Sequence, residues 1–266
     1  MKEELQTKVP FSMVIFLGLL TAITPLATDL YLPALPIMPS ELNTSASNIQ
    51  MTIGIMTIGL AIGNLIGGPI SDMFGRKMPL ILGNLLCVAS SILCAIAPSV
   101  ELLLIGRFLQ GLTGAFSVVI SKSIARDYAK GPALIKLFAT LMMVNGLAPV
   151  IAPLIGGQLL LFTTWRVIFV ILAIFSTILM IWSMIYKETL PPENRIDGGL
   201  TTSFKVYAQL LRDPSFLGQS LIQFFAFGAF FAYITGSSFV YQNIYGLNAQ
   251  QFSYMFGINS CGIIAA

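Results

Sequence analysis

Long apolar runs separated by short polar segments make up most of the chain. A helix that crosses a bilayer needs about 20 consecutive apolar residues, and seven runs are of about this length. An eighth run begins near residue 250 and is still apolar at Ala266. We therefore predict membrane-spanning helices at about residues 11–33, 49–71, 79–98, 102–123, 135–161, 166–186 and 215–237, with an eighth from about 250.

The composition indicates that lipid surrounds most of this chain. Of its 266 residues, 56% are hydrophobic and only 9% are charged, whereas soluble domains carry about 25% charged residues. A single soluble core could not hide so much apolar surface. The pattern and the composition together predict an all-α membrane protein.

Basic residues mark one side of the membrane. Short cytoplasmic loops are rich in lysine and arginine, and the loops on the other side carry Glu41, Glu101 and the single Arg166. We therefore predict a cytoplasmic N-terminus in a multi-pass protein of the bacterial inner membrane. The basic residues that carry this prediction are Lys2, Lys8, Arg76, Lys77, Arg126, Lys130, Lys187, Arg195, Lys205 and Arg212.

The segment 187–214 divides the chain. It is rich in charged residues, and "LPPENRIDGG" at its front contains the prolines and glycines that stop helices. We interpret 1–186 as an N-terminal six-span bundle, 187–214 as a cytoplasmic central loop, and 215–266 as the first spans of a second bundle. Within the loop, "TSFKVYAQLL" is either an amphipathic interfacial helix or a plain solvated linker. Because the last apolar run has no polar flank, we expect the chain to be part of a longer protein.

Two ionisable residues lie inside predicted spans. Asp29 is near the outer end of the first span, and Arg107 is about 9 Å below the same surface in the fourth. Ionisable groups in a membrane interior are rare and usually functional. We expect the two to pair across a central cavity, directly or through water. A static structural ion pair is the alternative.

The fifth predicted span carries a dense set of helix-breaking and small residues on one face. Prolines four residues apart bend a helix, and glycines on the same face let another helix approach closely. We predict a kinked, tightly packed helix contact there, which could also be purely structural. The residues are Gly146, Pro149, Pro153, Gly156 and Gly157.

The second predicted span also carries glycines at intervals of four. For Gly59, Gly63 and Gly67 we favour close helix packing over a functional role. The loop that follows reads "GGPISDMFGRKMPL", in which Asp72 and Arg76 can pair if the helix continues. An ordinary positive-inside loop would explain the two basic residues, but not the glycine and aspartate spacing.

These motifs together resemble the major facilitator superfamily. "GPISDMFGRKMPL" is similar to its loop 2–3 motif, and "LIGRFLQGLTGA" to its span-4 motif with Arg107, Gln110 and Gly111. "GLAPVIAPLIGG" resembles the span-5 motif of antiporters. With "TDLYLPALP" and "KETLPPENR", the chain resembles the bicyclomycin/chloramphenicol-resistance (Bcr/CflA) type of drug:proton antiporter.

The resemblance implies a twelve-span fold of two six-span halves, each built from inverted repeats. This chain would hold the first half, the central loop and the start of the second half. The resemblance also implies a cytoplasmic gate that locks the outward-facing state through charge pairs. Its residues are Asp72, Gly75, Arg76, Lys77 and Asp127.

The hypothesis that follows is proton-coupled efflux of small drug-like compounds. Asp29 would accept the proton, and Arg107 would modulate its affinity. The aromatic run "QFFAFGAFFAY" in the seventh span suits apolar ligands, although lipid-facing rings are an equal alternative. The expected cavity wall consists of Asn64, Gln110, Met142, Asn145, Gln223, Phe227 and Tyr233.

Two other functions stay open at this point. One is a facilitator or importer of a metabolite on the same fold, and the other is a non-transporting truncated fragment. An enzyme is not expected, because the chain has no histidine, no phosphate-binding loop and no cluster of metal ligands. We expect no cofactor and no nucleic-acid partner, since no clustered basic face is present. The expected partners are a small-molecule substrate, protons and the bilayer, with a monomer as the full-length form.

Overall fold

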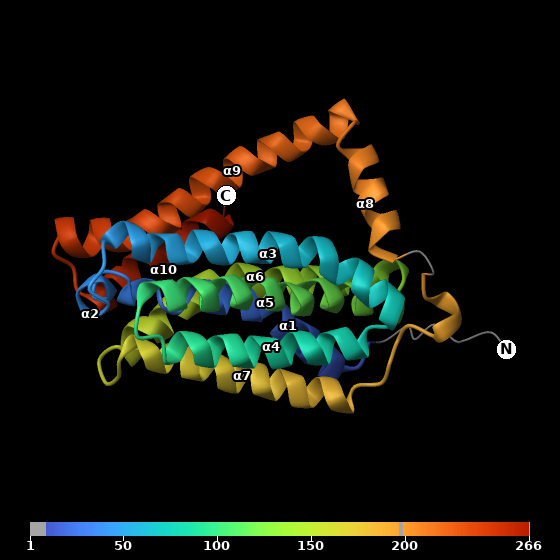
Figure 1. Ribbon diagram of the computed structural model, residues 1–266, viewed down its shortest axis with the longest axis horizontal. Helices are drawn as coiled ribbons and strands as arrows, with labels where there is room; N and C mark the ends of the chain where they lie inside the picture. The colour runs from blue at the N-terminus through green and yellow to red at the C-terminus, as the bar shows by residue number, and fades with distance from the viewer. Residues whose placement is uncertain (1–8, 197–198, 266) are drawn as a thin grey trace.

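The computed structural model describes residues 9–196 and 199–265, and the described residues fold almost entirely into helices (Figure 1). Lys2 and Lys8, on which part of the predicted orientation depends, lie outside the described residues. The long helices are α1 (Phe11–Asp29), α3 (Ala46–Phe74), α4 (Lys77–Ala95), α5 (Val100–Tyr128), α6 (Gly131–Leu159), α7 (Trp165–Ile185), α9 (Pro214–Phe239) and α10 (Ala249–Ala265). The short elements are η1 (Leu32–Ala34), α2 (Met38–Glu41), η2 (Pro192–Asn194), α8 (Gly199–Leu210) and the π-helical η3 (Val240–Ile244).

The predicted spans are confirmed as helices. Within the described residues, seven helices are long and apolar enough to cross a membrane, and each overlaps one predicted span. The eighth predicted helix is α10, which begins at Ala249. Of the two alternatives for the central loop, the helical one is found, because α8 covers most of "TSFKVYAQLL". The division into two bundles stays a prediction.

The helices start and stop for local reasons that the sequence carries. Ser45 caps α3 by accepting a hydrogen bond from the Asn48 N–H at 3.2 Å, and Asp213 caps α9 with Pro214 at its first position. Gly75 separates α3 from α4 with a φ of +89°, a backbone conformation that residues with a β-carbon rarely adopt.

Two ends of the bundle are used below as reference points. The Arg76 end holds the α3–α4 turn, the start of α1 and the ends of α5 and α7. The Glu41 end holds α2, η1 and the start of α7, where the Glu41 carboxylate accepts hydrogen bonds from Trp165 and Arg166. In Figure 1 the Arg76 end is on the right and the Glu41 end is on the left.

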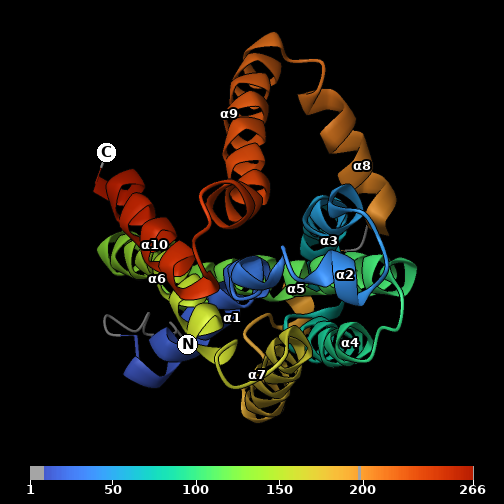
Figure 2. The same cartoon turned by 90° about the vertical axis from the view of Figure 1, so that its left-hand side faces the viewer.

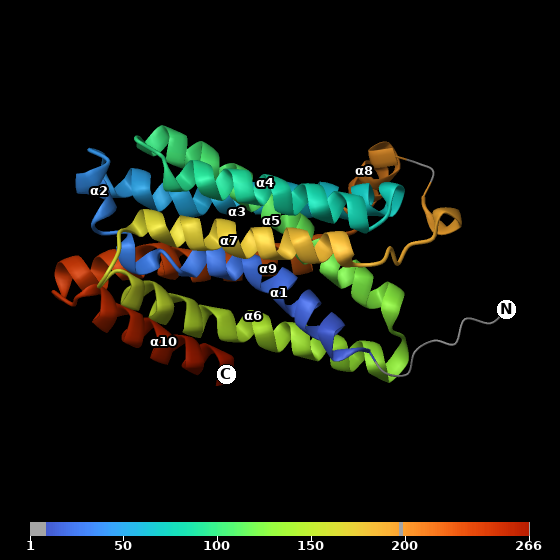
Figure 3. The same ribbon diagram turned by 90° about the horizontal axis from the view of Figure 1, so that it is seen from below.

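Helices α1 and α3 to α7 form one bundle, whereas α9 leaves it. Helix α5 packs along α3 and α4, α7 packs along α4, and α1 lies between α5, α6 and α7. Helix α10 packs beside α6 (Figure 3). Helix α9 meets the bundle only at the Glu41 end and diverges toward the Arg76 end, where α8 connects it back to α3 (Figures 1 and 2).

Contacts between backbones hold α3 against α5. A β-carbon added at Gly59 would collide with the Phe108 backbone, and one added at Gly63 would collide with the Leu112 backbone. The predicted role in close packing is therefore confirmed for Gly59 and Gly63, whereas a β-carbon at Gly67 would make only ordinary contacts with Phe116, at 3.6 Å. Gly111 on α5 meets the Met56 backbone in the same way, so both helices contribute to the contact.

The α3–α5 contact predicts a contrast between two glycines of one helix. Gly59→Ala should lower the midpoint of thermal unfolding in detergent by roughly 3–10 °C, because backbone atoms must move to admit the methyl group. Gly54→Ala is the matched control, since nothing lies within 4 Å of its added β-carbon and alanine favours the helix. Equal unfolding midpoints for the two variants would contradict the packing described here.

Candidate functional site

A small cavity lies between α1, α3, α6 and α9, and the last residue of α1 borders it. Asp29 is 3% exposed. Its side chain makes no hydrogen bond or ion pair in the described part of the chain. The cavity has a volume of about 160 Å³. Its other lining residues are Thr24, Pro25, Thr28, Met56, Thr57, Leu60, Asn145, Pro149, Phe227, Phe230, Phe231 and Ile234.

Arg107 is buried beside this cavity, on α5. Its Nη1 donates to the Ala27 carbonyl oxygen at 2.9 Å and to Gln110 Oε1 at 2.6 Å. The guanidinium carbon lies 4.4 Å from the centre of the Tyr31 ring. Nε and Nη2 have no hydrogen-bond partner among the described residues. The guanidinium is thus buried, but only Nη1 of its three nitrogens makes hydrogen bonds.

The direct Asp29–Arg107 ion pair is not formed in this conformation. The two residues lie close together, because Arg107 bonds the carbonyl of Ala27, two positions before Asp29. The guanidinium nevertheless turns to Gln110, whose Nε2 in turn donates to Ser91 Oγ at 2.8 Å. A carboxyl group and a guanidinium therefore share one buried region while each lacks the other as a partner.

The residues expected to form the cavity wall have different places. Asn145 and Phe227 do line the cavity of Asp29. Gln110 does not line this cavity, because its buried side chain bonds Arg107 and Ser91 instead. The Tyr233 ring stacks on Phe256 of α10, with ring centres 5.7 Å apart. The remaining three are exposed and do not line this cavity: Asn64, Met142 and Gln223.

The glycine and proline residues of α6 bring two other segments against it. A β-carbon at Gly156 would collide with the carbonyl of Leu30, the residue that directly follows α1. One at Gly157 would collide with Ser253 of α10. The chain stays helical through both prolines. In this set Pro149 lines the cavity, Pro153 is buried and Gly146 is half-buried.

A second group of charges lies at the Arg76 end. The Arg76 guanidinium bonds Asp72, the Asp127 carboxylate through Nε at 2.9 Å, and Ser71 Oγ at 2.9 Å. Burial acts to lower the pKa of Arg76, but hydrogen bonds and attraction from Asp127 and Asp72 outweigh it and raise this pKa. The predicted residues of this cluster are therefore adjacent, with Gly75 and Lys77 on either side of Arg76.

Glu188, which follows α7, completes this cluster and was not among the predicted residues. Its carboxylate accepts hydrogen bonds from the N–H groups of Arg76 at 2.9 Å and Lys77 at 3.0 Å. It also accepts from the N–H groups of Thr189 at 2.9 Å and Leu190 at 3.0 Å. Arg76 provides no side-chain cap for α4, so Glu188 supplies the missing cap from another part of the chain.

The Glu188 side chain also explains the turn before α4. A β-carbon at Gly75 would collide with the Glu188 carboxylate, so a glycine is needed there for space as well as for its φ. Partial burial acts to raise the pKa of Glu188, but the four N–H donors outweigh it and lower this pKa below its ordinary value of 4.5.

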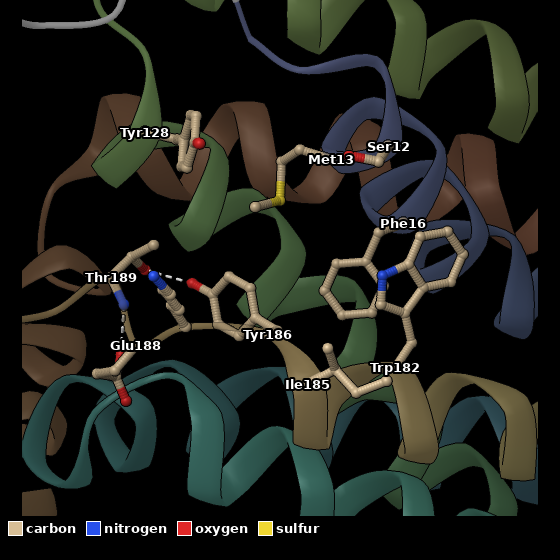
Figure 4. A pocket seen from close by; sticks show the side chains of 10 residues that line it. Ser12, Met13, Phe16, Tyr128, Trp182, Ile185, Tyr186, Glu188 and Thr189 are labelled. Carbon is tan, nitrogen blue, oxygen red and sulfur yellow. Dashed lines mark hydrogen bonds between the residues drawn. The ribbon is translucent and has the colours of Figure 1, made fainter.

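Beside Glu188, a cavity of about 370 Å³ opens between the start of α1 and the ends of α5 and α7 (Figure 4). The Tyr186 hydroxyl donates to Thr189 Oγ1 at 2.6 Å. The Thr189 hydroxyl in turn donates to Asp127 Oδ2 at 3.2 Å. The cluster at the Arg76 end thus extends through hydrogen bonds to an aromatic wall. The wall contains Phe16, Tyr128, Trp182 and Tyr186.

Fold and site together define a multi-pass helical membrane protein with a buried acid beside a cavity. No group of three or more residues suited to a metal ion occurs in the described part of the chain. A family model described as Major Facilitator Superfamily matches residues 17–266, and the chain belongs to this family. The predicted superfamily is confirmed, and it is a family of transporters rather than of enzymes.

Named relatives agree with this assignment. The chain is 43% identical over 252 residues to the uncharacterized MFS-type transporter YdgK of Bacillus subtilis, covering 94% of this chain and 63% of that protein. It is 33% identical over 262 residues to a bicyclomycin resistance protein homolog of Haemophilus influenzae, covering 98% of this chain and 66% of that protein. The chain therefore spans just under two thirds of the length of each relative.

A solved structure shares the fold. The crystal structure of a D-xylose–proton symporter superposes with a TM-score of 0.70 at 16% sequence identity, covering 94% of this chain and 66% of that chain. At this identity the likeness concerns the fold alone. It confirms the all-α membrane architecture of the transporter superfamily.

The cap that Glu188 provides predicts an effect on local opening. Glu188→Ala should raise the amide hydrogen exchange of the first turn of α4 about fivefold, because the loss of a helix cap costs about 1 kcal/mol. Exchange followed by mass spectrometry measures this. The carboxylate binds the N–H groups only when ionised, so its stabilising effect is present above pH 4.5. It is lost as the pH falls through the lower pKa of the folded state.

Glu193→Ala is the matched control for this experiment. Glu193 belongs to the same segment, is exposed and has no hydrogen bond among the described residues. Exchange of the α4 amides should stay unchanged in that variant. If Glu188→Ala and Glu193→Ala gave the same exchange, Glu188 would not be the cap of α4.

Proposed function

We propose that a transporter containing this chain exports small drug-like compounds across the bacterial inner membrane in exchange for protons. The observation that carries the proposal is the buried carboxyl group of Asp29, which has no bonding partner and borders a cavity beside Arg107. The printed name of the Haemophilus influenzae relative, a bicyclomycin resistance protein homolog, supports a drug as substrate. The Bcr/CflA-type resemblance of the sequence supports the same assignment.

Asp29 is the proposed proton carrier. An ionised carboxylate without a partner is costly away from water, and either a proton or a cation relieves that cost. Arg107 offers two unbonded N–H groups a short distance away. In the proposed cycle, Asp29 takes up a proton from outside and releases it to the cytoplasm. In its ionised form it is stabilised by Arg107, by water in the cavity or by a bound substrate.

The substrate is proposed to be small and partly apolar. Three phenylalanine rings of α9 face the polar groups of Asn145 and Thr24, whose hydroxyl has no partner among the described residues. Binding sites for drug-sized ligands usually exceed about 300 Å³, more than the 160 Å³ of this cavity. We therefore infer that substrate also contacts the exposed faces of α3, α6 and α9, which carry Asn64, Met142 and Gln223.

The two remaining sets of predicted residues keep their proposed roles. Asp72, Arg76 and Asp127, with Gly75 and Lys77 at the turn, form the proposed cytoplasmic gate, which puts the Arg76 end and the N-terminus in the cytoplasm. Helix α9 diverges from the bundle toward that end (Figure 1). Helix α6, with its proline and glycine motif, is the proposed antiporter helix.

Replacement of the proposed proton carrier tests this function. Asp29→Asn in everted membrane vesicles should reduce gradient-driven uptake of an organic cation such as ethidium to the level of vesicles without the protein. The amide cannot release a proton, so the proton gradient loses its effect on transport. Exchange of labelled substrate without a gradient should persist.

Glu101→Gln is the control. Glu101 is an exposed acid at the start of α5, and its replacement should leave coupled transport at the wild-type level. Full coupled transport by Asp29→Asn would remove Asp29 from the mechanism. Gradient-independent transport by the unmodified protein would instead favour a facilitator.

A further inference from the structure

The Arg107 guanidinium lies against two aromatic rings that also contact each other, with ring centres 5.6 Å apart. Its central carbon is 4.4 Å from the centre of the Tyr31 ring and 5.6 Å from that of Phe169. Both rings are fully buried. A guanidinium over an aromatic face is attracted electrostatically, and the attraction grows when water is excluded. These rings stabilise Arg107 in a position where it does not touch Asp29.

Tyr31 is held in place by α3. The Thr52 hydroxyl donates to the Ile49 carbonyl oxygen at 2.6 Å, so the Tyr31 hydroxyl is the donor in the 2.7 Å bond to Thr52 Oγ1. Tyr31 is also fully buried, so packing as well as this bond keeps the ring in its place. Tyr31 is only two residues after Asp29. One short segment therefore carries both the Asp29 carboxyl group and a ring that competes with it for Arg107.

Arg107 has two possible sets of partners. In the observed position it bonds Ala27 and Gln110 and faces the rings, but Nε and Nη2 remain unbonded. A buried N–H without an acceptor is unfavourable. An ionised Asp29 would supply the missing acceptor, and a neutral Asp29 would supply a much weaker one. The rings of Tyr31 and Phe169 therefore oppose the Asp29 carboxylate in binding the same cation.

Few other titratable groups surround this pair. Among the described residues, α5 contributes Arg107, the segment after α1 contributes Tyr31, and α4 contributes the buried Cys94 thiol. Helices α3, α6 and α9 bring only neutral side chains to the cavity of Asp29. From α7, the uncharged Phe169 ring faces the guanidinium. The position of Arg107 is thus the main variable that can change the charge state of Asp29.

We propose that Tyr31 is a positioning residue that keeps Arg107 away from Asp29 and thereby makes Asp29 easier to protonate. The positioning role concerns the protonation of Asp29 itself, and only its consequence for transport rests on the function proposed above. Loss of the Tyr31 ring frees Arg107 to pair with Asp29, and the pair favours the ionised carboxylate. The pH at which half of Asp29 carries a proton should then fall.

The pH dependence of carbodiimide labelling tests this directly. Dicyclohexylcarbodiimide reacts with neutral carboxyl groups, and mass spectrometry of the peptide that contains Asp29 measures the labelled fraction without a transport assay. Tyr31→Leu should move the half-labelling pH downward by about one to one and a half units, the shift that loss of a buried cation–π contact would produce. Tyr31→Phe keeps the ring and should stay within about 0.3 units of the unmodified protein.

Two further variants keep the result unambiguous. Phe169→Leu should shift labelling in the same direction but less, because that ring is farther from the guanidinium, and it replaces Tyr31→Leu if the latter does not fold. Phe256→Leu is the control, since it removes a buried ring of the same apolar cluster that does not face Arg107. An unchanged half-labelling pH in both leucine variants at positions 31 and 169 would overturn the proposal. A shift of the half-labelling pH in Tyr31→Phe or in Phe256→Leu as large as that in Tyr31→Leu would also overturn it.

Failure of this inference and failure of the proposed function have different signatures. If Asp29 labelling shifts as expected but Asp29→Asn still transports with full coupling, the positioning role stands and the antiport proposal falls. If Asp29→Asn loses coupling but labelling does not respond to Tyr31→Leu, the antiport proposal stands and Tyr31 has no positioning role.

Discussion

The carboxyl group of Asp29 and the guanidinium of Arg107 are buried in one region without being joined, and the rest of the site depends on this separation. A membrane interior tolerates such groups only where protein dipoles, rings or water replace the lost hydration. Arg107 receives two oxygen acceptors and two aromatic faces. Asp29 receives a cavity instead of a partner. The acid is therefore the group of the pair that is free to respond to a proton or a ligand.

Close helix packing makes this polar interior possible. Glycines bring the backbones of α3 and α5 into contact, and Gly156 brings α6 against the end of α1. Helices packed this closely leave side chains such as Arg107 no route to lipid, so their polar groups must find partners inside the bundle. At the Arg76 end, the same bundle brings together Asp72, Asp127 and Glu188, which stabilise a single turn between two helices.

The sequence was sufficient to predict the features that depend on short spacing. Apolar runs predicted the spans, glycines four apart predicted close packing of the second span without its partner, and the four-residue interval between Asp72 and Arg76 predicted their pair. Glu188 could not be found this way, because it meets Arg76 only through the fold, 112 positions along the chain. Its visible signals were its place just after an apolar run and within "KETLPPENR", and neither names Arg76 as its partner. The side-chain direction of Gln110 could not be predicted from the sequence either, since it depends on Ser91 of a neighbouring helix.

Proton release on substrate binding is the decisive measurement for a buried acid that is free to exchange its proton. A weakly buffered solution of the purified transporter, with a pH indicator, is mixed with a transported compound near the half-labelling pH of Asp29. We expect a release of protons in proportion to bound substrate, which fades at pH values where Asp29 is already ionised. Substrate binding with no proton release at any pH would show that Asp29 does not exchange a proton for substrate.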